Sequence, residues 1–108
     1  NNMEQPNISY IHDMSGGDKN FEKKILGIMK REFPLEMQAY FTSMNNKDFI
    51  HASEIVHKIK HKISILGLEE SYENAIAFEH GLRESDVALR SKFEKTLVII
   101  TNYFKTIK

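Results

Sequence analysis

The sequence contains no cysteine, and this absence excludes several kinds of chemistry at once. Disulfide bonds, thiol nucleophiles, thiolate zinc sites and iron–sulfur clusters all require cysteine. Long apolar runs are also missing, because the longest purely aliphatic stretch, Leu97–Ile100, is far shorter than the ~20 residues that span a bilayer. Neither a membrane-spanning helix nor a basic-then-apolar signal peptide is predicted, and we expect a cytoplasmic protein.

An excess of charge of one sign is absent too. Lys plus Arg and Asp plus Glu number 15 each in 108 residues, so the sequence lacks the basic surplus of nucleic-acid-binding proteins. The hydrophobic fraction of 41% and the charged fraction of 28% are those of folded domains rather than of disordered or fibrous chains. Residues 1–108 are therefore predicted to form one domain, since domains mostly contain ~100–150 residues.

Glycine and proline are scarce, with five and two residues, and they lie where helix boundaries are expected. Apolar residues recur every three or four positions, which is the period of a helix, and no long segment alternates with a period of two. Residues 1–17 form a polar lead-in with one short apolar group that could cover the core, Ile8, Tyr10, Ile11 and Met14.

The apolar stripes predict four helices, the first of them kinked at Pro34, at 19–44, 48–66, 69–84 and 87–107. The connections between them are short, and short connections make neighbouring helices antiparallel. The predicted fold is therefore all-α, an antiparallel up-down four-helix bundle with a short N-terminal covering segment.

The helix predicted at 48–66 carries the most informative polar residues. With ~100° between successive residues, its apolar side chains fall in one arc about 120° wide, centred near Ala52 and Ile59. His57 lies roughly 140–160° from the centre of that arc, so we expect its imidazole to face water. Histidine titrates near neutral pH, and an exposed imidazole that is unprotonated is a nucleophile.

Other residues of this helix are expected to surround His57 on the exposed side. Three lysines and no acid lie in His57–Lys62, which predicts a local positive patch on a neutral protein. Lys60, one turn from His57, is placed to neutralise phosphoryl oxygens. The same face is predicted to offer docking contacts to a partner protein through Ile50, Ser53, His61, Ser64 and Ile65.

The run from His57 to Gly67 resembles the signature of histidine-containing phosphotransfer (HPt) domains. That signature is H-x-[LI]-K-G, then four variable residues, an apolar residue and glycine. The matching positions are His57, Ile59, Lys60, Leu66 and Gly67. The resemblance extends over essentially the whole chain, since Ser15–Asp18 before an apolar helix, Phe33-Pro34 between two apolar stripes and a polar turn before the histidine helix also fit.

The resemblance implies a helical bundle with an exposed phospho-accepting histidine. HPt domains relay phosphoryl groups between aspartates of response-regulator receiver domains in two-component phosphorelays. His57 would be the phosphorylation site, attacking through Nε2, and Lys60 would stabilise the phosphate. Such a domain is a carrier rather than an enzyme, without an ATP site and without a cofactor, because the partner receiver supplies Mg²⁺.

The implied partners are receiver domains and a hybrid histidine kinase, in the same chain or in another, with no role for nucleic acid or membrane. Two residues depart from the family pattern: His61 stands where glycine is usual, and Lys62 replaces a small residue. His61 would narrow the choice of receiver, hydrogen-bond the phosphoryl group or mark a degenerate domain. The first interpretation is favoured because His57 and Lys60 are retained.

Two alternatives use the same residues. In one, the bundle is a non-catalytic protein-binding module, a degenerate HPt domain that docks a receiver without phosphotransfer. In the other, Glu54, His57 and His61 form part of a metal site, since their spacing places them on one face of the helix. An inward-facing fourth ligand is not identified, so no metal site is predicted.

Overall fold

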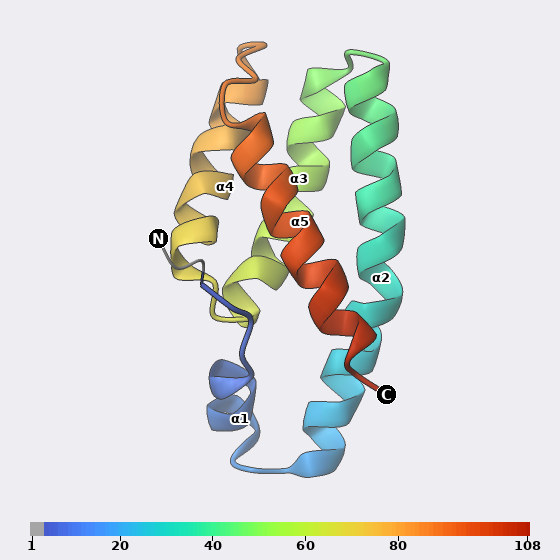
Figure 1. Cartoon of the computed structure of the whole chain (residues 1–108), viewed down its shortest axis with the longest axis vertical. Coiled ribbons are helices and arrows are strands. Elements are labelled where there is room, and N and C mark those ends of the chain that lie inside the picture. Colours follow the sequence, from blue (N-terminus) through green and yellow to red (C-terminus); the bar gives the residue numbers. More distant parts are fainter. Residues whose placement is uncertain (1–3) are drawn as a thin grey trace.

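The computed structural model describes residues 4–108, which form five α-helices (Figure 1). The helices are α1 (Ser9–Ser15), α2 (Lys19–Asn45), α3 (Phe49–Ile65), α4 (Glu69–Leu82) and α5 (Arg90–Lys105). Figure 1 shows α2 to α5 running alternately up and down, with α1 beside the start of α2. This arrangement confirms the predicted all-α up-down bundle with its N-terminal covering segment. No helix in the described part of the chain is both long and apolar enough to cross a membrane.

Short polar contacts set the ends of the helices. The carboxylate of Asp18 accepts hydrogen bonds from the backbone N–H groups of Asn20 and Phe21, and it thereby caps α2. Asp48 caps α3 in the same way, by accepting from the N–H of His51. These caps satisfy N–H groups that have no partner inside their helix.

The connection between α3 and α4 depends on Gly67. Its φ of +75° lies in the left-handed region, which favours glycine. A Cβ at this position would lie 2.5 Å from the side chain of Asn7, so the N-terminal segment passes directly over the turn. The N–H of Asn7 donates to the carbonyl of Leu66 at 2.9 Å, which fixes that segment against the bundle.

The long helix α2 continues without a break through Pro34. Proline has no N–H, so the carbonyl of Lys30 loses its usual helical donor. Figure 1 shows the axis of α2 changing direction part-way along its length, as the predicted kink requires.

The core contains side chains from every helix. Its largest fully buried members are Ile11, Phe33, Tyr40, Ile59, Ile63, Leu66, Leu68, Phe78, Leu82, Phe93, Leu97 and Ile100. Tyr40 lies at an aromatic centre, with its ring centroid 6.3 Å from that of Phe78 and 5.2 Å from that of Phe93. Burial, together with the hydrogen bond that the Tyr40 hydroxyl donates to Glu94, raises the pKa of the tyrosine.

Some boundaries differ from those expected. The last helix begins at Arg90 rather than at 87, because turns occupy the preceding residues and Ser85 has a φ of +61°. The lead-in, expected to be polar with one short apolar group, contains a seven-residue helix, α1. Ile11 is its buried residue, whereas Tyr10 and Met14 are 55% and 50% exposed, so only part of the expected apolar group covers the core.

Glu22 joins α1 to α2. Its Oε2 accepts a hydrogen bond from the Ser15 hydroxyl at 2.9 Å and lies 2.9 Å from Nδ1 of His12. The hydrogen bond from Ser15 lowers the pKa of Glu22; burial opposes this effect, and His12 adds to it. The folded protein therefore favours the ionised carboxylate.

We expect the attachment of α1 to weaken on acidification. A lowered pKa stabilises the fold above the ordinary value of 4.5, and this contribution is lost as the pH falls through the folded pKa. Between about pH 7 and about pH 3, the urea concentration at the denaturation midpoint should decrease more for wild type than for Glu22→Gln. The exposed acid Glu73 provides the control, since Glu73→Gln should behave as wild type. Equal losses in wild type and Glu22→Gln would contradict this role of Glu22.

Candidate functional site

His57 lies on the outer side of α3, with 51% of its side chain exposed. The residues beside it in sequence that face inward, Val56 and Ile59, are completely buried. Nδ1 of His57 lies 3.0 Å from Oε2 of Glu79, a residue of α4. One nitrogen of the ring therefore contacts the neighbouring helix, while the ring remains accessible at the surface.

Three cationic or polar groups surround the buried carboxylate of Glu79. Besides His57, Nζ of Lys60 lies 2.9 Å from Oε1, and Nη2 of Arg83 donates to Oε2 at 2.9 Å. Only 5% of Glu79 is exposed. Burial alone would raise the pKa of this acid, but the hydrogen bonds and charges of Lys60 and His57 outweigh burial and lower the pKa. Glu79 is therefore ionised at neutral pH.

The ionised carboxylate determines which nitrogen of His57 carries the proton. A carboxylate only accepts hydrogen bonds, so Nδ1 must be the donor. In the neutral imidazole the lone pair then lies on Nε2. The arrangement resembles the carboxylate–histidine pairs that orient catalytic and metal-bound imidazoles. It makes Nε2 the nucleophilic atom.

Lys60 and Arg83 reach the same carboxylate from different elements and differ in accessibility. The side chain of Lys60 is 13% exposed, whereas that of Arg83, on the turn after α4, is 50% exposed. The sequence predicted Lys60 on the exposed side beside His57, whereas its largely buried ammonium group is the ion-pair partner of Glu79. Both cations pair with the carboxylate that contacts Nδ1 of His57.

His61 is exposed and contacts His57 directly. The two ring centroids are 4.9 Å apart and the ring planes are inclined at 89°, an edge-to-face arrangement. Helical side chains lean toward the N-terminus, and His61 follows His57 by one turn, so its ring reaches back to the first imidazole. The rings of His57 and His61 form one surface feature.

The expected docking contacts are only partly on the surface. Ile50, 55% exposed, and Ser64 are accessible, whereas Ile65 is half-buried and packs against the core. The prediction for Ser53 is wrong: it is 1% exposed and its hydroxyl donates to the carbonyl of Ile50. Ser53 lies about 100° around the helix from Ala52, outside the apolar arc, yet the packing of the bundle buries it.

The predicted positive patch is also wrong. Lys62 is 8% exposed, and its Nζ donates to Glu32 and Glu36 of α2, each at 2.9 Å. Two residues of separation turn the helix by about 200°, so Lys60 and Lys62 face opposite neighbours. Of the three lysines in His57–Lys62, only Lys58 is exposed.

Neither Glu79 nor Arg83 was predicted from the sequence. A signal was present, because Glu79 lies in the apolar stripe of its helix, four residues after Ala75 and three before Leu82. An acid at a core position needs a cationic partner. The identity of that partner depends on the packing of α4 against α3, which a single helix does not reveal.

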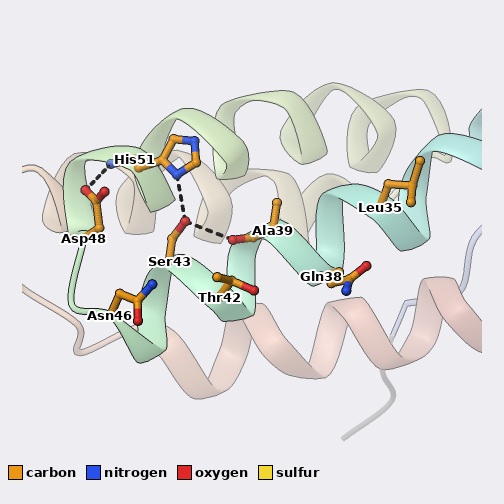
Figure 2. Close-up of a pocket in the computed structure, with 8 residues that line it drawn as sticks. All are labelled: Leu35, Gln38, Ala39, Thr42, Ser43, Asn46, Asp48 and His51. Carbon is orange, nitrogen blue, oxygen red and sulfur yellow. Dashed lines mark hydrogen bonds between the residues drawn. The ribbon is translucent and has the colours of Figure 1, made fainter.

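A second group of polar residues lines a pocket of about 330 Å³ at the turn between α2 and α3 (Figure 2). Ser43 and His51 meet there, with Oγ 2.9 Å from Nδ1. The hydroxyl donates to the carbonyl of Ala39, so His51 must donate to the hydroxyl and does not act as its base. Asp48 accepts from the backbone of His51, as Figure 2 shows, and not from the imidazole. This group is a helix-end contact and not a nucleophilic triad.

Within residues 4–108, no three His, Asp or Glu side chains are placed to hold a metal ion, so the structure does not join Glu54 to His57 and His61 as ligands. Comparison with known protein families, curated proteins and solved structures finds no match for this chain. The function is therefore inferred from the geometry around His57.

The ion pairs of Lys62 predict that two matched lysine variants differ in stability. Lys62→Met leaves Glu36 partly buried without its cation, and we expect the free energy of unfolding to fall by about 1–3 kcal/mol. Lys58→Met, four residues earlier and exposed, should change it by less than about 0.5 kcal/mol. Urea denaturation of both variants checks this, and equal stabilities would show that the pairs with α2 contribute nothing.

Proposed function

We propose that this domain is a phosphoryl carrier of the HPt type. It accepts a phosphoryl group on Nε2 of His57 from the aspartate of a receiver domain and passes the group to another receiver. The observation that carries the proposal is the contact between Glu79 and Nδ1 of His57, because it leaves the lone pair on the other nitrogen of a half-exposed ring. The signature-like run from His57 to Gly67 supports the same function.

The proposed transfer of the phosphoryl group needs no general base from this domain. The lone pair of Nε2 attacks the phosphorus of an aspartyl phosphate, the N–P bond forms, and the P–O bond to the aspartate breaks. The aspartate leaves as a carboxylate. The proton on Nδ1 stays in place, so the phosphorylated ring is positively charged, and the carboxylate of Glu79 stabilises that charge.

The reverse step uses the same groups. A receiver aspartate attacks phosphorus, and His57 leaves as a neutral imidazole that still carries its Nδ1 proton. Because no proton has to be removed or returned, loading and unloading follow one path in opposite directions. This reversibility suits a carrier between two aspartates.

Positive charge near His57 offsets the charge of the incoming phosphoryl group. Arg83 is half exposed and already lies at the Oε2 atom that His57 contacts, so its guanidinium can turn toward a phosphoryl oxygen. Lys60 contributes from the more buried side of Glu79. Both groups act by electrostatic stabilisation, which dominates phosphoryl transfer.

The function is tested with phosphoramidate and with a receiver phosphorylated on aspartate, each as phosphoryl donor. Wild type should gain acid-labile label, and ³¹P NMR should assign it to Nε2. His57→Gln should gain none. His80→Gln, which alters an exposed histidine of α4, should label as wild type does. Equal labelling of wild type and His57→Gln would end the proposal.

The non-catalytic alternative has one observation in its favour, the exposed aliphatic side chain of Ile50, two turns before His57. The same experiment separates the alternatives. Binding of the receiver without label on wild type would identify a docking module, and label confined to His57 would identify a carrier.

Substitution of Glu79 tests the stabilisation of the charged ring. Glu79→Gln keeps an oxygen that accepts from Nδ1 but removes the negative charge, so we expect phosphorylation by phosphoramidate to slow by about tenfold. The rate is measured on fully folded protein, since Lys60 and Arg83 lose their ion pair and stability should fall. Unchanged rates would show that the charge of Glu79 plays no part in the transfer.

A further inference from the structure

The contact between His57 and His61 is not needed to define the nucleophile, and it calls for a separate explanation. Glu79 contacts one edge atom of the His57 ring, Nδ1, at 3.0 Å. A single hydrogen bond leaves the ring free to tilt about that contact. The ring of His61 supplies the second contact, at 4.9 Å between centroids and 89° between planes.

The other charged groups near His57 do not make this second contact. Lys60 and Arg83 both form ion pairs with the carboxylate of Glu79 and not with the imidazole. Glu54 and Lys58 are exposed on α3. In the described part of the chain, the aromatic ring that contacts the ring of His57 is that of His61.

We propose that His61 is a positioning residue, whose ring holds the imidazole of His57 in the single orientation that presents Nε2 for transfer. The ring of His57 is restrained in two directions. Glu79 fixes it in its plane through Nδ1, and the perpendicular ring of His61 fixes its tilt. The effect on transfer rests on the proposed function, whereas the effect on ring orientation does not.

Orientation matters because the ring is half exposed. A surface side chain changes rotamer readily, and each rotamer that turns Nε2 away is unproductive for an in-line attack. An edge-to-face aromatic contact changes a conformational equilibrium by roughly two- to tenfold. The rate lost on removing His61 should therefore lie in that range.

Three substitutions of His61 separate ring packing from hydrogen bonding. His61→Ala removes both, His61→Phe keeps the ring but no polar atom, and His61→Gln keeps a donor but no ring. Alanine is preferred to glycine because glycine would destabilise the helix by about 1 kcal/mol. Lys58→Ala, at an exposed position of the same helix, is the control.

The first measurement is made on unphosphorylated protein. Three-bond NMR couplings to Cγ of His57 report its χ1 rotamer. We expect one rotamer in wild type, His61→Phe and Lys58→Ala, and averaged couplings in His61→Ala and His61→Gln. Couplings in His61→Ala that equal those of wild type would overturn the proposal, and this result does not depend on phosphotransfer.

The second measurement is the rate of labelling by phosphoramidate. We expect His61→Ala and His61→Gln to be slower by roughly two- to tenfold and His61→Phe to match wild type. A full rate in His61→Gln with a slow His61→Phe would instead assign His61 a hydrogen bond to the phosphoryl group and overturn positioning. If wild type takes no label, the proposed carrier function fails, and the NMR couplings alone decide whether His61 positions the ring.

Discussion

The carboxylate of Glu79 is the constraint on which the site depends. An acid buried in the interface between two helices is costly unless cations and donors surround it. Glu79 meets this requirement with His57 and Lys60 from α3 and Arg83 from the end of its own helix. The contact that makes the buried charge tolerable is therefore also the contact that sets the tautomer of His57.

The helix α3 uses its charged residues to bind both neighbours. Lys60 reaches Glu79 on α4, and Lys62 reaches Glu32 and Glu36 on α2. Hydrogen bonding and charge from these partners outweigh burial and raise the pKa of Lys62, so the ammonium group remains charged inside the bundle. Charges that look like a single surface patch in the sequence are distributed between two interfaces.

The fold could be predicted because the apolar stripe of each helix shows which face is buried. Short connections also limit the number of possible topologies. The exposure of His57 followed from the same periodicity. Ser53 and Lys62 were misplaced because the angle from an apolar arc does not show which polar positions a neighbouring helix covers. Glu79 was missed for a related reason, since its partners come largely from another helix.

An exposed carrier group has two conflicting requirements, access for a partner and a fixed direction of attack. Burial would fix the imidazole of His57 but close it to a receiver, so the ring must be held from its edges. Glu79 holds it from within the bundle, and in the proposed arrangement His61 holds it from the surface. The lowered pKa of Glu79 adds a further condition, because a weakly basic carboxylate would leave the proton on Nδ1 through the proposed loading and unloading. In the proposed transfer, the imidazole then serves as a leaving group as well as a nucleophile.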